Sequence, residues 1–188
     1  MAQPTVLDIY NGALAAANAS LMATDSEDTS TGDIVRALYP TRYRAILDLG
    51  AWPWATTRAT LASGVRTASD TEYADKYPLP TTLIRMIGVM GNANWAQEGF
   101  NLHIDDNNGI VIKFVYEAPI AEISGGAQLL LTTGLAIDLA TAFLRDEGMA
   151  RRLQETYQGQ LRIALASIQG FGDMPTGTFD NPIEHGIR

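Results

Sequence analysis

The chain has 188 residues, 18% of them charged, no cysteine and a formal net charge of −8. This length suits one domain, or one domain with an insertion, and is enough for a sizeable core. The absence of cysteine excludes disulfides and zinc–thiolate sites, and the acidic balance argues against tight, sequence-specific binding to nucleic acid.

The N-terminal part of the chain has helical spacing. Apolar residues recur every three to four positions between Val6 and Ala17, which predicts an amphipathic first helix. The segment Ser30-Thr31-Gly32-Asp33 resembles a capping box, in which a hydroxyl and a carboxylate satisfy the first free amides of a helix. A second helix is therefore expected to begin there.

The pattern of this second helix contains Pro40, which removes a backbone hydrogen bond. We therefore expect a kink or a helix in two pieces, ending at Gly50 and Pro53. The segment Trp52-Pro53-Trp54 marks the junction with the next part of the chain, where the tryptophans are expected to anchor core packing. Stacking of a sugar or a base on them is the alternative.

The middle of the chain, residues 65–117, has strand patterning. Leu83–Met90 is short, apolar and branched, whereas Asn101–Ile104 and Ile110–Tyr116 alternate between two faces. The Asn-Gly pair between the last two segments is typical of a hairpin turn. We therefore predict a small inserted antiparallel sheet, with a hairpin turn at Asn107, Asn108 and Gly109.

Helical spacing resumes in residues 118–169 as two apolar stripes, Leu129 to Leu144 and Leu153 to Ile168, separated by Gly148. These stripes predict two core helices packed as an antiparallel pair. The predicted fold class is therefore α+β. An antiparallel bundle of about four helices, formed by residues 1–64 and 118–169, carries the β-rich insertion.

Residues 170–188 lack periodicity and combine repeated glycine and proline with isolated large apolar side chains. They form either a frayed tail or an extended C-terminal arm that docks on another subunit. In the second interpretation, the docking residues are Phe171, Met174 and Phe179.

Residues typical of catalysis or of metal and cofactor binding are sparse. His103 and His185 have no Gly-x-Ser-x-Gly elbow near them, and no phosphate loop or dinucleotide fingerprint is present. Asp105-Asp106-Asn107-Asn108-Gly109 lacks the glycine and glutamate positions of a calcium loop. We therefore expect no enzymatic activity, no catalytic residues, no cofactor and no metal.

Targeting signals are also missing from the sequence. Met1-Ala2-Gln3-Pro4 does not have the basic and then apolar pattern of a signal peptide. Polar and small residues interrupt Leu129 to Leu144, the longest apolar stretch, which we interpret as too short and too polar to span a membrane. We expect an intracellular protein without a membrane partner.

Several short motifs follow one another between residues 4 and 169. They are Tyr10-Asn11-Gly12-Ala13-Leu14, an arginine-rich second helix, Trp52-Pro53-Trp54-Ala55, Tyr77-Pro78-Leu79-Pro80 and Leu83-Ile84-Arg85. In this order they resemble the tail tubular protein A family of short-tailed bacteriophages, which are head-to-tail adaptors. We assign the structural junction to the residues Trp52, Pro53, Trp54, Tyr77, Pro78 and Pro80.

This resemblance implies a structural virion protein and connector without enzymatic activity. It implies a homo-oligomeric ring of about twelve subunits that lies beneath the portal protein, continues the DNA channel and accepts the tail nozzle, with tail fibres nearby. Such a protein is made in the host cytoplasm and ends in the virion tail, at the head–tail junction, where it serves DNA ejection. Residues 170–188 would contact the portal, and the turn at Asn107–Gly109 would contact the tail side.

Two other functions stay open at this point. Carboxylate pairs such as Asp146-Glu147 are compatible with an acidic hydrolase, for instance one that acts on cell-wall sugar. A helical protein that binds a small ligand between its helices is the third interpretation.

Overall fold

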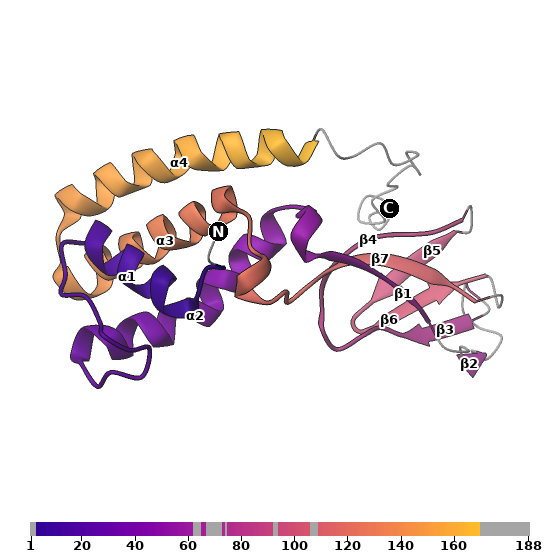
Figure 1. Ribbon diagram of the computed structural model, residues 1–188. Coiled ribbons are helices and arrows are strands. Elements are labelled where there is room, and N and C mark those ends of the chain that lie inside the picture. Colours follow the sequence, from indigo (N-terminus) through magenta and orange to yellow (C-terminus); the bar gives the residue numbers. More distant parts are fainter. Residues whose placement is uncertain are drawn as a thin grey trace, which may run out of the picture.

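The computed structural model describes residues 3–61, 65–66, 73, 75–91, 94–105 and 109–169. In these described residues, four α-helices gather at one end and seven strands at the other (Figure 1). The predicted α+β class, with strands inserted between two pairs of helices, is therefore confirmed. The predicted C-terminal arm, residues 170–188, lies outside the described residues.

The first helix, α1, spans Val6–Ala16 and begins at a capping box. The Thr5 hydroxyl accepts a hydrogen bond from the Asp8 amide, and the Asp8 carboxylate accepts one from the Thr5 amide at 2.8 Å. This reciprocal pair satisfies amides that a helix start otherwise leaves free. The apolar side of the helix is buried as predicted, through Ile9, Tyr10, Ala13 and Leu14.

Helix α2 spans Ser30–Leu49 and starts one residue away from the predicted cap. Thr29, not Ser30, is the N-cap, and its hydroxyl accepts the Gly32 amide at 3.0 Å. The predicted capping box is therefore wrong, because the Asp33 carboxylate pairs with Arg36 instead of turning back to the cap.

The predicted division of α2 into two pieces is also wrong. The helix is continuous across Pro40 and ends at Gly50, as the sequence predicted for its C-terminus. Helix stability in proteins comes mostly from the packing of a buried face, so one missing backbone hydrogen bond does not end the helix.

Helix α3, Gly125–Leu139, continues as a π-helical turn, η3, at Ala140–Leu144. Helix α4, Glu147–Gln169, then returns beside it, which confirms the predicted antiparallel pair (Figure 1). The boundary between these two helices lies before Gly148, the residue at which the sequence predicts it. The chain reverses at Arg145, which adopts a left-handed conformation with φ 52°, and Gly148 lies in the first turn of α4.

The apolar stripe predicted for this region is confirmed only in part. Leu129 and Leu144 are 50% and 38% exposed. Helix α3 packs against α1, α2 and α4, so it is buried on most sides and a single stripe underestimates its core face. Its fully buried leucines are Leu130, Leu131, Leu135 and Leu139.

The helical segment Gly125–Leu144 is 20 residues long and, by length and composition alone, apolar enough to cross a membrane. This segment is longer than Leu129 to Leu144, the stretch that we interpret from the sequence as too short and too polar to span a membrane. Half of its most apolar window is buried inside the molecule, a property that core helices of globular proteins share.

The strands form two antiparallel sheets, not the single sheet that was predicted. The first sheet has the order β1-β7-β4, with β1 at Thr56–Thr60, β7 at Val111–Tyr116 and β4 at Leu83–Val89. The second has the order β2-β3-β6-β5, with β2 at Val65–Arg66, β3 at Asp75–Pro78, β6 at Asn101–Ile104 and β5 at Trp95–Glu98. Strand β1 lies within residues 1–64, which we had assigned to the helices, so the strands begin earlier than predicted.

The predicted hairpin between β6 and β7 is wrong, because these strands belong to different sheets. Strand β6 instead forms a hairpin with β5 through a two-residue loop, Gly99 and Phe100, with Glu98 paired to Asn101. Gly99 has φ +57°, the left-handed conformation that glycine adopts most readily at the first loop position. Asn107 and Asn108 lie outside the described residues.

Among the described residues, buried apolar side chains form two clusters. One joins the four helices and includes Val115 of β7. The other lies among the strands and includes Ile112 and Phe114 of the same strand. Because neighbouring residues of a strand point to opposite faces, β7 contributes to both clusters.

Candidate functional site

Five aromatic rings form a continuous row where the helices meet the strands. Tyr10 lies edge-on to Tyr39, with ring centroids 5.5 Å apart, and Tyr39 stacks on Tyr43 at 5.6 Å. Tyr43 stacks on Trp54 at 6.5 Å, and Trp54 lies 6.0 Å from Trp52. Offset stacked and edge-on pairs are favourable arrangements of aromatic rings, so the row stabilises the junction.

Hydrogen bonds to the backbone hold this aromatic row in place. The Trp52 indole donates to the Ile46 carbonyl at 2.7 Å, and the Tyr43 hydroxyl donates to the Ala118 carbonyl at 2.6 Å. The second bond ties α2 to the segment that follows β7. The row therefore connects the place where the chain leaves the helices with the place where it returns.

The geometry of the tryptophans bears on the alternative of ligand stacking. Trp52 is 2% exposed, so no sugar or base has access to its ring. Trp54 is partly buried, and no described atom accepts a hydrogen bond from its buried indole nitrogen. A half-open hollow of about 300 Å³ adjoins both, lined by Trp52, Pro53, Trp54, Ser124, Ser167 and Ile168.

The tyrosines of the row stay neutral at physiological pH. Burial, reinforced by Tyr10 and Glu117, raises the pKa of Tyr39 to about 12. Burial also raises the pKa of Tyr43 and of Tyr10. A phenol in this state does not act as a base, so the row is a packing element.

The residues that we assigned to one structural junction are not all brought together. Trp52 and Trp54 belong to the helical cluster, whereas Tyr77 is buried in the strand cluster. Pro78 ends β3 in an exposed position, and the Pro80 carbonyl accepts the amide of Leu83 at the start of β4. Pro53 is the first residue of a short 3-10 helix, Pro53–Ala55.

An ion pair inside the helical bundle was missed. The Arg42 guanidinium of α2 binds the Asp138 carboxylate of α3 through two nitrogens, with Nε 2.9 Å from Oδ2. Burial on its own would lower the pKa of Arg42, but the hydrogen bonds and charges of Asp138 and Tyr157 together outweigh burial and raise it. The Arg42 side chain lies against Gly134, where a Cβ atom would come within 2.9 Å of its Cδ atom.

Arg42 falls on the polar side of the helical pattern, yet its side chain lies part-buried against α3. The sequence did hold a signal. A carboxylate such as Asp138 within an apolar core helix needs a cation, since an unpaired buried charge is unfavourable. Sequence spacing alone does not say which arginine supplies that cation.

The other candidate residues lie apart from this junction. His103 lies in β6, within a segment predicted as a strand, and it is buried, with Nε2 3.5 Å from a carboxylate oxygen of Glu98. Gly109 has φ +58°. Within the described parts of the chain, no group of three or more histidine, aspartate or glutamate residues is placed to hold a metal ion. Phe171, Met174 and Phe179 lie outside those parts.

Neither a protein-family model nor any curated protein sequence matches this chain. A functional proposal therefore rests on the order of the sequence motifs and on the geometry described above.

Proposed function

We propose that this protein is a head-to-tail adaptor of a short-tailed bacteriophage. As a ring of about twelve subunits, it lies beneath the portal protein, continues the DNA channel and accepts the tail nozzle. The observation that carries this proposal is the strand unit inserted between α2 and α3 of a helical bundle. That architecture is what the resemblance to the tail tubular protein A family implies.

The motif residues support a structural role, because they build the scaffold. The Asn11 amide nitrogen donates to the Met22 carbonyl at 2.9 Å, and its oxygen accepts the Met22 amide at 2.8 Å. This pair fastens the loop between α1 and α2. Gly12 lets α1 approach α3, since a Cβ atom there would meet the Thr132 methyl group at 2.8 Å.

The motif Trp52-Pro53-Trp54-Ala55 also has a structural role. Trp52 closes the end of α2 through its hydrogen bond to Ile46, and Ala55 is fully buried beside it. Each of these side chains contacts other parts of the same subunit. The residues that carry the resemblance thus preserve a shape, as expected for a subunit of an assembly.

The charge of the chain supports the same function. A net charge of −8 repels a phosphate backbone, which suits a channel through which DNA slides without being held. In this proposal, Phe171, Met174 and Phe179 contact the portal. The segment Asn107–Gly109 contacts the tail side.

The test is sedimentation of the full chain with the portal ring encoded beside it. We expect a saturable complex with the portal ring, and loss of that complex when residues 170–188 are removed. Circular dichroism of the truncated chain checks that its helices remain. A full chain that stays free beside an intact portal contradicts the adaptor proposal, and a truncated chain that still binds contradicts the role of residues 170–188.

A further inference from the structure

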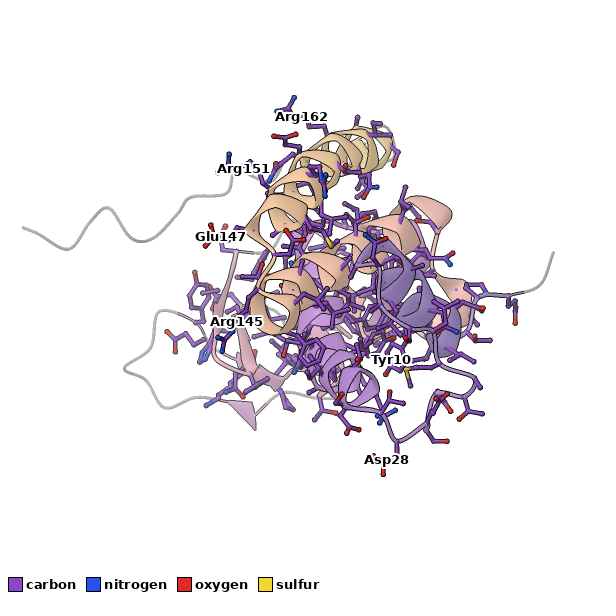
Figure 2. All side chains as sticks on the ribbon, turned by 90° about the vertical axis from the view of Figure 1, so that its left-hand side faces the viewer. Tyr10, Asp28, Arg145, Glu147, Arg151 and Arg162 are labelled. Atoms are coloured by element: carbon purple, nitrogen blue, oxygen red, sulfur yellow. The ribbon has the colours of Figure 1, made fainter. Side chains whose placement is uncertain are left out.

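Helix α4 lies on the outside of the bundle and presents a basic outward face. Arg151 and Arg162 extend away from the other helices at the top of the view in Figure 2, and Arg152 is exposed too. Among the described residues, none of these arginines forms an ion pair. Glu147 and Glu155 are the exposed acidic residues of this helix, so its three arginines leave a net charge of +1 in an acidic protein.

The same helix also exposes a large apolar side chain to solvent. Ile163 is 76% exposed, more than any other large hydrophobic side chain in the described parts of the chain. Gly159, in the middle of the helix, has open space where a Cβ atom would point. A glycine there weakens the helix and serves no packing inside the subunit, but it leaves room for another chain to approach closely.

An acidic loop, residues 23–28, lies on the opposite side of the bundle. Asp28 is at the bottom of Figure 2, away from Arg151 and Arg162 at the top. Arg36 holds the loop in shape, but through the backbone carbonyls of Asp25 and Glu27, at 2.9 Å each. The side chains of Asp25 and Asp28 are exposed, so their charge is available to a partner.

We propose that the outward face of α4 in one subunit contacts the loop of residues 23–28 in a second copy of the chain. Opposite charges on opposite sides of one molecule produce a head-to-tail contact, and such contacts close into a ring when the rotation between subunits permits. The inference rests on the proposed ring and names the two surfaces that join its subunits.

Two charge-reversed variants test this contact. One carries Arg151→Glu and Arg152→Glu, and the other carries Asp25→Arg and Asp28→Arg. In each variant alone, both surfaces have the same sign, so we expect self-association to weaken at least about tenfold. In an equimolar mixture every contact again joins opposite charges, so assembly returns. Sedimentation velocity at low salt measures all of these states.

A matched control reverses two exposed arginines elsewhere, Arg44→Glu and Arg58→Glu. It changes the net charge by the same amount and should assemble like the unmodified chain. A symmetric contact of α4 with α4 does not use the loop of residues 23–28, so it would leave the Asp25→Arg, Asp28→Arg variant able to assemble alone. A mixture that stays monomeric overturns the proposal. A variant that assembles normally alone, or an unmodified chain that remains monomeric at high concentration, overturns it as well.

The portal experiment separates this inference from the proposed function. If the subunits do not associate through these surfaces but still co-sediment with the portal, the contact is wrong and the adaptor proposal stands. If they form the head-to-tail contact and do not bind the portal, the adaptor proposal fails while the contact stands.

Discussion

The helical and strand parts of this chain differ in how their interiors are connected. In the helical part, one large cluster is linked to the backbone by side chains such as Tyr43 and Trp52, which donate hydrogen bonds to backbone carbonyls. In the strand part, a smaller cluster lies among two short sheets. Strand β7 contributes residues to both clusters.

This difference indicates how each part contributes to stability. Loss of a residue from the aromatic row disturbs α1, α2 and the two places where the chain passes between the helices and the strands. The reason is that each ring contacts the next one in the row. Loss of a residue from the strand cluster disturbs a unit that touches the helices mainly through β7 and β4. Three predictions examine this contrast, and the first has the largest expected effect.

Replacement of Trp52 by alanine should destabilise the whole helical part. The substitution removes a buried indole and its hydrogen bond to Ile46, so the free energy of unfolding should fall by about 3–5 kcal/mol. Urea unfolding followed by circular dichroism measures the change. The control is Trp95→Ala, since Trp95 is only partly buried in the strand part and its loss should be smaller. Equal losses would show that the aromatic row has no special weight.

Replacement of Leu102 by alanine should act on the strand part alone. Leu102 is fully buried between strands, and its truncation should cost about 2–5 kcal/mol in that cluster. We expect faster amide hydrogen exchange in β3, β5 and β6, with exchange in α3 unchanged. If α3 exchanges faster to the same extent, the two clusters unfold as one cooperative unit and the contrast is wrong.

Alkaline pH should weaken the helical part selectively. Because burial raises the pKa of Tyr39 to about 12, the unfolded chain loses this proton first, near its ordinary value of 10. Stability is therefore full below pH 10 and is lost as the pH rises toward 12, by roughly 1–2 kcal/mol after allowance for partial exposure. Unfolding curves across this range provide the measurement. A Tyr39→Phe variant whose alkaline loss is unchanged would contradict the assignment.

The helices were largely predictable because their signal is local. Apolar spacing located α1, α2, α3 and α4, and Gly50 located the end of α2. The errors lie where tertiary packing overrides a local rule, as at Pro40, or where a non-glycine residue such as Arg145 makes the turn. The Arg42–Asp138 pair was hidden, because its partners are 96 residues apart.

The sheets were predictable as strands but not as pairs. Alternation located β6 and β7 almost to the residue, yet it contains no information about which strands pair. The Asn108-Gly109 dipeptide favoured a local hairpin, and the non-local pairing of β6 with β3 prevailed. Strand β6 therefore belongs to the second sheet and β7 to the first, although they follow one another along the chain.

The most direct test of the adaptor proposal is electron microscopy of portal rings incubated with the full chain. We predict a second, coaxial ring of about twelve copies beneath the portal, with an open passage along the common axis. Bare portal rings, or single copies attached without closing into a ring, would contradict the proposal.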